Sequence, residues 1–388
     1  MEEWKIYRLE EIGKIVTGKT PSTKNPYNYG GDIHFITPGD LCNGNKHIVY
    51  TNRNITTSGL SSIKGSILPK GAICVSCIGN LGYTGIATMQ CASNQQNNSI
   101  IVNPNHNPDF IYYVIKHLWP YFKSLEGQST ALSILNKSQF SKIEIPLPNK
   151  KTQNIIASIL SSLDDKIELN NRINHNLEEQ AQIVFDRIFN SDLTNNCLLS
   201  SIVDINPKRT LRKNEVARCI DMTYLNTTGS FPSGWEFEPY SGGMKLINGD
   251  TLMARITPCL ENGKVAYINF LDKEETAFGS TEYIVFHAKE GYPNEMFYFL
   301  TRNKAFIEFA TKNMNGSSGR QRVSGETIGN YIIPVLSEDD INELKTVCES
   351  TMKEILKNNL ESRVLSEMRN TILPKLMSGE LKINDLTC

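Results

Sequence analysis

The chain has 388 residues, 39% of them hydrophobic, and its 40 Lys and Arg nearly balance 41 Asp and Glu, leaving a net charge of −1. This length and composition suit two or three globular domains and exclude a disordered chain. No run of about eighteen apolar residues exists, so we expect no transmembrane helix. Nine irregularly spaced cysteines and an acidic, mixed N-terminus predict a cytoplasmic protein with reduced thiols and no secretory signal.

The charge is distributed unevenly along the chain. Residues 1–146 hold 13 basic and 9 acidic residues, whereas residues 191–334 hold 15 basic and 16 acidic ones. Only the first segment is clearly basic, so any contact of the second segment with nucleic acid has to come from local clusters of charge.

Near the N-terminus, "GKIVTGKT" (Gly13–Thr20) matches the phosphate-loop pattern G-x-x-x-x-G-K-[ST]. Such a loop follows a buried apolar strand and opens a helix, because backbone N–H groups at a helix start bind the phosphates. Here the preceding residues are densely charged, and Pro21, Pro26 and Gly30 interrupt any helix that would follow. We therefore expect another role for this loop, with an autonomous nucleotide hydrolase built on Gly13–Thr20 as the alternative.

The chain contains an internal repeat with an offset of about 190 residues. Both copies carry short β-prone runs and amphipathic helices, followed by one long helix. The clearest correspondences join 8–15 to 198–205, 69–87 to 247–266, 126–148 to 315–336 and 152–189 to 341–377. The β-prone runs are 71–79, 99–103, 142–147, 281–288 and 330–336, and the shorter helices are expected at 108–125 and 294–313.

These elements predict an α+β fold with two pseudo-repeated globular domains separated by two long antiparallel helices. We place the first globular domain at 1–147, a central helix at 148–190, the second globular domain at 191–335 and a C-terminal helix at 336–388. Polar loops rich in Gly and Asn connect the strands of both domains, and such loops commonly carry recognition.

The central helix has a heptad seam in which apolar residues step alternately by four and three, with Asn170 and Asn174 at two of its positions. An amide at a seam position usually fixes the register or the partner of a coiled coil. The C-terminal helix has a less regular seam, expected at Val347, Met352, Ile355, Leu360, Leu365, Met368, Ile372 and Leu376. Because the repeat makes both helices leave equivalent domains, we expect them to pair as one antiparallel coiled coil.

No catalytic set emerges from the motifs. An adenine methyltransferase would need an N/D-P-P-aromatic box, which is missing. Asp164, Asp165 and Lys166 are the nearest approach to a nuclease metal cluster, but we expect them on a solvated helix face. Cys74 and Cys77 have C-x-x-C spacing without a second pair, so a structural role is favoured. The six histidines form no H-x-x-x-H pair, so no metal site is expected.

The order of these segments resembles the specificity subunit of type I restriction–modification enzymes across nearly the whole chain. The likeness lies in "TGKTPSTKNPYNYGGDIHFITPGDL", "NGSSGRQRV", "IPLPNKKTQNIIASILSSLDDKIELNNRINHNLEEQAQIVF" and "ILPKLMSGEL". The resemblance implies two target-recognition domains, each reading one half of a split double-stranded DNA site. It also implies a subunit that is not itself an enzyme. It would bind methyltransferase subunits, expected as two copies, and through them a restriction and translocase subunit. S-adenosylmethionine, ATP and Mg²⁺ are then expected on those partners, with no cofactor and no metal on this chain.

Candidate DNA-binding residues combine base-reading amides and guanidinium groups with hydroxyls and lysines for phosphate. In the second domain, Arg320 and Arg322 flank Gln321 in a loop whose glycines allow close backbone approach. The first-domain set is Lys19, Thr20, Ser22, Lys24, Gln95, Gln96, Gln128, Ser129 and Thr130. The second-domain set is Arg255, Asn262, Ser317, Ser318, Arg320, Gln321 and Arg322. Two of the first-domain residues, Gln95 and Gln96, are followed by Asn97 and Asn98, and these four amides could read bases or could satisfy strand edges.

We place methyltransferase docking on the exposed faces of the helices around Ile155–Phe189 and Ile341–Leu376, with Asn170 and Asn174. The first of these spans about 50 Å at 1.5 Å per residue, longer than one DNA turn of about 34–36 Å, so it suits a spacer between half-sites. A second alternative is a coiled-coil scaffold that does not bind DNA.

Overall fold

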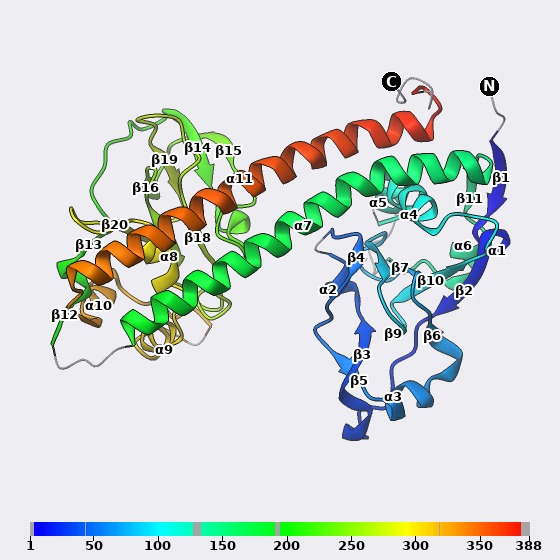
Figure 1. The fold of residues 1–388 in the computed structure, drawn as a ribbon, viewed down its shortest axis with the longest axis horizontal. Coiled ribbons are helices and arrows are strands. Elements are labelled where there is room, and N and C mark those ends of the chain that lie inside the picture. The colour runs from blue at the N-terminus through cyan, green and yellow to red at the C-terminus, as the bar shows by residue number, and fades with distance from the viewer. Residues whose placement is uncertain (1–3, 43, 127–132, 191–194, 318, 382–388) are drawn as a thin grey trace. The chain divides into compact units, whose positions relative to one another are not determined.

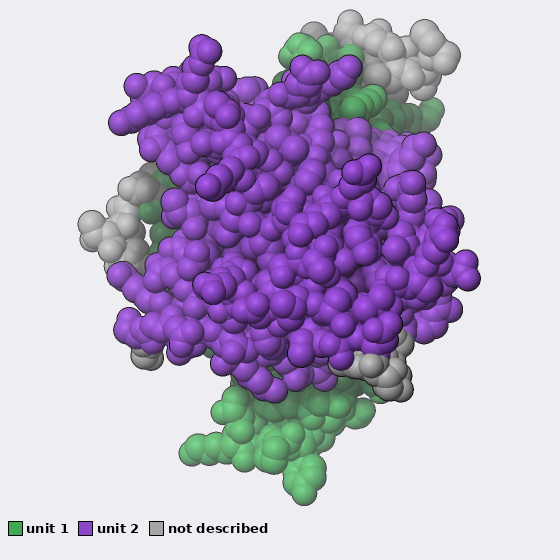
Figure 2. All heavy atoms as spheres, turned by 90° about the vertical axis from the view of Figure 1, so that its left-hand side faces the viewer, with its two compact units in different colours: residues 1–168, 362–388 green, residues 169–361 purple. Residues whose placement is uncertain are grey.

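The computed structural model describes residues 4–42, 44–126, 133–190, 195–317 and 319–381 (Figure 1). The chain divides into two compact units, residues 1–168 with 362–388 and residues 169–361, which are coloured separately in Figure 2. Each unit contains one globular α+β part and a portion of both long helices. None of the helices in the described ranges has the length and apolar character needed to cross a bilayer.

The globular part of the first unit is built on a five-stranded sheet with the order β2-β10-β7-β8-β4. Its strands are β2 (Gly13–Thr17), β4 (His47–Ile48), β7 (Ile73–Ser76), β8 (Thr84–Ala87) and β10 (Asn97–Val102). A second sheet has the order β5-β3-β9-β6, with β3 (Tyr29–Ile36), β5 (Asn54–Ile55), β6 (Ile67–Leu68) and β9 (Cys91–Ser93). The N-terminal strand β1 (Lys5–Arg8) pairs with β11 (Glu144–Leu147), the strand that leads into the central helix.

Shorter α-helices lie in the described part of this unit beside its two short 3-10 helices. They are α1 (Leu9–Ile12), α2 (Pro38–Leu41), α3 (Thr57–Ser62), α4 (Pro108–His117), α5 (Trp119–Glu126) and α6 (Lys137–Ser141). The Asn107 side chain caps α4 by accepting from the Phe110 backbone N at 2.9 Å, and Pro108 takes the first helical position. Residues 110–115 of α4 are all buried, so this helix forms the centre of the core. The single helix expected at 108–125 is two helices, because α4 ends at His117 and α5 begins at Trp119.

The globular part of the second unit repeats this plan. One sheet has the order β13-β20-β17-β18, from β13 (Val203–Ile205), β17 (Thr251–Ala254), β18 (Val265–Tyr267) and β20 (Tyr283–Ala288). The other has the order β15-β14-β19-β16, from β14 (Val216–Ile220), β15 (Glu236–Pro239), β16 (Met244–Leu246) and β19 (Ala277–Gly279). The pair β12 (Asn196–Leu198) and β21 (Ile332–Pro334) answers β1 and β11, and β14 runs parallel to β19 as β3 does to β9. Apart from β4, which has no counterpart in the four-stranded sheet, the strand order is shared, and this confirms the internal repeat.

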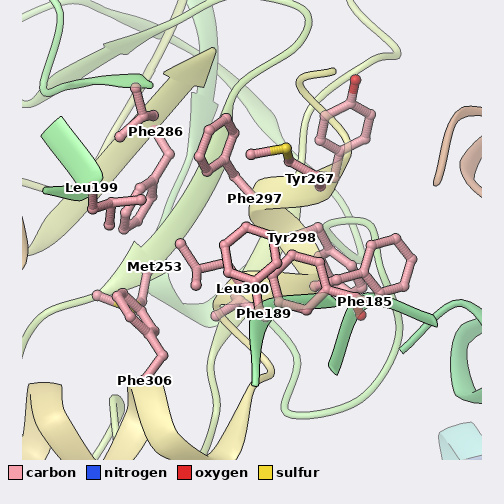
Figure 3. Packing of buried hydrophobic residues seen from close by; sticks show 14 of the residues in the cluster. Phe185, Phe189, Leu199, Met253, Tyr267, Phe286, Phe297, Tyr298, Leu300 and Phe306 are labelled. Carbon is pink, nitrogen blue, oxygen red and sulfur yellow. The ribbon is translucent and has the colours of Figure 1, made fainter. Parts of the chain in front are cut away.

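The core of the second unit is rich in aromatic side chains. Figure 3 shows Phe185 and Phe189 of the central helix close to Tyr298 and Leu300 of α8 (Met296–Leu300). In the described residues of this globular part, two more α-helices follow, α9 (Lys304–Lys312) and α10 (Gly325–Gly329). The helix expected at 294–313 is also two helices, because the Asn303 side chain accepts from the Phe306 backbone N at 3.0 Å and starts α9 anew.

The two long helices are α7 (Lys150–Phe189) and α11 (Glu338–Met377), each of 40 residues. Within the second unit they pair antiparallel: Asn170 bonds to Glu361 at 2.8 Å, whereas Arg187, further along α7, bonds to Glu343, earlier in α11. Asn174 and Asn358 lie between them, with the Asn358 amide donating to Asn174 at 2.8 Å. This confirms the antiparallel coiled coil for the part of the pair inside this unit.

The seam expected on α11 is wrong at two positions, because Leu360 is 52% exposed and Met368 is 46% exposed. Burial on α11 instead follows another regular heptad that includes small and polar side chains. Its positions are Leu344, Cys348, Thr351, Ile355, Asn358, Ser362, Leu365, Arg369, Ile372 and Leu376, all buried or half-buried. A pattern of apolar residues alone does not find this seam.

Candidate nucleic-acid interface

The segment Gly13–Thr20 is strand β2 followed by an irregular loop, and no helix starts there. The backbone N of Gly18 donates to the Asn97 carbonyl at 3.0 Å, and that of Lys19 donates to the Ser93 carbonyl at 2.8 Å. A β carbon at Gly18 would lie 2.0 Å from the Asn94 carbonyl oxygen, so packing explains the glycine. The N–H groups that would cradle a nucleotide phosphate are therefore already bonded, and the nucleotide-hydrolase alternative loses its site.

This loop places several of the candidate side chains at the surface of the first unit. The Thr20 hydroxyl donates to the Gln95 side-chain oxygen at 2.6 Å, which joins the loop to the turn that follows β9. Lys19, Ser22, Lys24 and Gln95 are exposed and Thr20 is half-buried. We call Lys19, Thr20, Ser22, Lys24 and Gln95 the first loop face.

The neighbouring amides serve the fold instead. Asn97 is fully buried and its amide donates to the Ile36 carbonyl at 3.0 Å. Asn98 is 3% exposed and its side chain accepts from Thr17 at 2.7 Å. Gln96 is half-buried and bonds to Asn94 at 2.8 Å. For Asn97 and Asn98, the interpretation as strand-edge partners is thus the correct one. Gln128, Ser129, Thr130 and Ser318 lie outside the described residues.

In the second unit, the segment from Asn315 to Arg322 folds back on itself. Asn315 and Arg322 exchange two backbone hydrogen bonds of 2.9 Å, and the Arg320 backbone N donates to the Ser317 carbonyl at 3.0 Å. Gly316 has φ +132° and Gly319 has φ +79°, conformations that favour glycine. Ser317 and Arg320 are consequently exposed in a tight turn, and Gln321 is half-buried.

Arg322 is engaged within the protein. Its Nε donates to Glu282 Oε2 at 2.9 Å and its Nη2 donates to Oε1 at 2.7 Å, a bidentate pair. The hydrogen bonds from Arg322 hold the pKa of Glu282 below its ordinary value. The guanidinium predicted to contact DNA directly is thus committed to holding the turn in place.

The fold brings Arg255 to the same place as Arg322 and Glu282. The Arg255 backbone N donates to the Glu282 carbonyl at 2.9 Å, and its carbonyl accepts from the Val323 N at 3.0 Å. Among the described residues, no hydrogen-bond partner reaches the Arg255 Nε. The charge of Arg255 also helps to lower the pKa of Glu282, so two guanidinium groups, those of Arg255 and Arg322, act on one carboxylate. Asn262 is exposed on the turn before β18. We call Arg255, Asn262, Ser317, Arg320 and Gln321 the second loop face.

The helices present different residues from those expected. Asn170 is fully buried and Asn174 is 8% exposed, because both amides bond across to α11, so they fix the helix pair and do not lie on a docking face. Asp164 is also buried, at 3% exposure, and bonds to Tyr113 and Arg369, which corrects its expected place on a solvated face.

Large apolar side chains remain exposed on both long helices. On α7, Leu169 and Ile173 are 44% and 36% exposed and lie four residues apart. On α11, Leu360 of the second unit is 52% exposed, and Val364 and Met368 of the first unit are 55% and 46% exposed and lie four residues apart. The signal in the sequence is a second set of apolar residues at four-residue spacing outside the buried seam.

Cys74 and Cys77 are both buried in the core of the first unit. Burial raises the pKa of each thiol to about 11. Thiolates, the form that binds metals, are therefore scarce here at neutral pH, which agrees with the structural role expected for the pair.

Residues 1–179 match a family model described as the type I restriction modification DNA specificity domain. The type I restriction enzyme MjaIX specificity subunit of Methanocaldococcus jannaschii is 26% identical over an alignment covering 99% of this chain and 95% of that protein. The HindI specificity subunit of Haemophilus influenzae is 33% identical over 49% of this chain and 42% of that protein. The crystal structure of a type I restriction–modification S subunit from M. genitalium aligns with a TM-score of 0.57 and 17% identity over 97% of this chain and 96% of that one, so the fold is shared.

Proposed function

We propose, from the premise that this chain belongs to the family of type I restriction–modification specificity subunits, that it reads a bipartite double-stranded DNA target with one half-site per globular part. The observation that carries the proposal is one plan of strands built twice, with a different set of exposed and half-buried loop side chains on each copy. Two copies of one scaffold bearing different polar side chains suit two different half-sites.

The loop faces suggest how each half-site is read. Arg320 is exposed, and a guanidinium can donate two hydrogen bonds to guanine O6 and N7 in the major groove. Gln95 offers an amide, which suits adenine, and Lys19 and Lys24 beside it suit phosphate. Arg322 acts on recognition through the turn that it holds against Glu282.

Specificity subunits of this family are non-catalytic, and we propose that this chain recruits its catalysts. The exposed apolar side chains of α7 and α11 provide surface for methyltransferase subunits, of which we propose two, and a restriction subunit would join through them. S-adenosylmethionine, ATP and Mg²⁺ would then be bound by the partners.

The test is co-expression with a methyltransferase subunit of such a system, followed by mapping of the methylated bases. We expect a split target. Arg320→Ala should relax one half-site and Gln95→Ala the other. The matched control, Lys273→Ala, alters an exposed cation of the second unit outside the loop face and should leave the target intact. A continuous target, or one in which Arg320→Ala and Gln95→Ala affect the same bases, contradicts the proposal.

The spacer is tested separately. Insertion of seven residues into both α7 and α11 keeps the heptad register and adds about 10 Å of helix, or about three base pairs at 3.4 Å each. The mapped target should keep both half-sites and gain that spacing. A scaffold that does not bind DNA would show no DNA affinity at low salt, whereas recognition through phosphate predicts steep salt dependence.

A further inference from the structure

Three side chains of types that can bind metal ions meet in the first unit, where β4 lies against α7. Glu168 accepts from the His47 backbone N through Oε1 at 2.8 Å, and its Oε2 lies 2.8 Å from the His47 Nδ1. Asp165 completes the group, since the potential ligand atoms of the three residues all lie within 4.8 Å of one another.

The elements around this group hold its members in position. Asp165 and Glu168 are three residues apart on α7, so they share a helix face. Next to His47, the Lys46 ammonium is bonded to Asp109 of α4 at 2.7 Å and to Ser161 of α7 at 2.7 Å. Lys46 is 3% exposed, so this anchor fixes the backbone from which His47 projects. Ligands on elements fixed in this way need little rearrangement to bind an ion.

We infer that His47, Asp165 and Glu168 form a binding site for a divalent transition-metal ion, with Zn²⁺ as the best chemical match. Imidazole nitrogen and carboxylate oxygen are ligands of Zn²⁺, whereas Mg²⁺ and Ca²⁺ prefer oxygen alone. The ion would take the place of the proton between Nδ1 and Oε2. Adjacent tetrahedral ligands about 2.0–2.1 Å from Zn²⁺ lie roughly 3.4 Å apart, so Nδ1 and Oε2, which are 2.8 Å apart here, would have to separate slightly.

The remaining contacts suit this exchange. Glu168 Oε1 keeps its bond to the His47 backbone N, so Oε2 is free to turn from proton to ion. Asp165 is exposed and can approach by a change of rotamer, and water would complete the coordination. Because the ligands come from β4 and α7, a bound ion would tie the globular part of this unit to its helix and stabilise the folded state by mass action.

The experiment titrates the full chain, freed of any histidine tag, with Zn²⁺ and with Co²⁺ as a spectroscopic probe. The hydrogen bond to Glu168 raises the pKa of His47, so the titration is run at a pH of about 8 to limit competition by protons. We expect one equivalent to bind, a rise in unfolding temperature with Zn²⁺, and visible Co²⁺ absorption without a thiolate charge-transfer band.

Asp165→Asn is the most informative variant, because Asp165 is exposed and its replacement should leave the metal-free unfolding temperature unchanged. Both Asp165→Asn and Glu168→Gln should weaken Zn²⁺ binding at least tenfold. The matched control is His175→Ala, which removes a histidine 3.4 Å from Glu179 on the exposed side of the same helix and should bind as the unaltered chain does. Binding unchanged in Asp165→Asn and Glu168→Gln, a thiolate band, or no saturable binding would overturn the inference.

Discussion

The two units attach their globular parts to the long helices with different chemistry, although both follow one plan of strands. In the first unit, the contacts are charged and buried: Asp164 of α7 bonds to Arg369 of α11 and accepts from the Tyr113 hydroxyl of α4 at 2.6 Å. Asp164 and Arg369 have side chains only 4% and 12% exposed. Such a pair contributes little net folding stability, because desolvating both charges offsets their attraction. Removing one partner is destabilising, because it leaves the other charge buried and unpaired.

In the second unit, the corresponding contacts are mainly aromatic, and the Asp186 carboxylate of α7 accepts from the uncharged Asn303 amide at 2.8 Å. Phe185 is fully buried, with its ring stacked on Phe189 at 4.0 Å and tilted toward Phe299 at 6.5 Å. The Gln182 amide donates to the Phe299 carbonyl at 3.1 Å. One topology therefore tolerates two kinds of helix attachment, which should respond differently to truncation and to salt.

The largest effect is expected from Phe185→Ala in the second unit. Removing this ring leaves a cavity in the core, which costs about 3–5 kcal/mol of the free energy of unfolding. Urea unfolding, followed by Trp235 fluorescence in a background with Trp4 and Trp119 replaced by Phe, measures it. The loss should be the same at low and high salt. Ile183→Ala, at a site on the same helix that is 69% exposed, should change stability by less than about 0.5 kcal/mol. Equal losses for the two variants would contradict the comparison.

A smaller loss is expected from Arg369→Ala in the first unit. Asp164 would keep Tyr113 but lose its cation, which costs about 2–3 kcal/mol. Urea unfolding followed by Trp4 and Trp119 fluorescence, in a background with Trp235 replaced by Phe, measures this loss. The control is Arg363→Ala, which breaks an exposed pair with Glu367 on α11 and should cost less than about 0.5 kcal/mol. If Arg369→Ala behaved like Arg363→Ala, the helix attachment of this unit would not depend on its buried charges.

The contrast between the units also separates what the sequence predicts from what it does not. Heptad spacing predicted α7, and the internal repeat predicted the paired domains. Both patterns can be read from the spacing of residues along the chain. The true seam of α11 escaped because Thr351, Asn358 and Arg369 occupy seam positions, and their burial depends on partners from other segments. Helix breaks at Leu118 and at Asn303 escaped because a short interruption hardly disturbs the apolar period.

The same limit applies to the candidate sites. Polar loops rich in Gly were found as exposed recognition segments, since composition alone favours the surface. The sequence could not predict whether a given side chain is free to contact DNA, because its partner within the protein can be distant in sequence. Arg322, for example, is bonded to Glu282, 40 positions away. His47 and Glu168 meet across 121 positions, so no spacing rule could join them.

The two loop faces also differ in how they are held, because the turn of the second loop face is held by the ion pair of Arg322 and Glu282. Glu282→Ala should free Arg322 and loosen the turn. The preference for the matched second half-site over an altered one should then fall by about 1 kcal/mol. Methylation rates on matched and altered targets measure this preference. The pKa of Glu282 is lowered in the folded protein. The stability that ionised Glu282 contributes to the folded protein is therefore complete above the ordinary pKa of 4.5. It is lost as the pH falls through the lowered pKa. Recognition measured between about pH 6 and 8 should not change through this group. A tighter second half-site in Glu282→Ala would mean that Arg322 reads DNA itself.

The smallest effect is expected on the first loop face, where a neutral hydrogen bond takes the place of the ion pair. Thr20→Val removes the donor to Gln95 and keeps the side chain's shape. The folded turn should therefore lose about 0.5–1 kcal/mol of stabilising free energy. Recognition of the first half-site should fall only slightly, with no dependence on pH, because neither Thr20 nor Gln95 titrates. Thr20→Ser, which restores the hydroxyl, should recover the loss. Methylation rates at both half-sites decide the matter: a Thr20→Val effect as large as that of Glu282→Ala would mean that Thr20 contacts DNA itself, and the two faces would then not differ as their hydrogen bonding indicates.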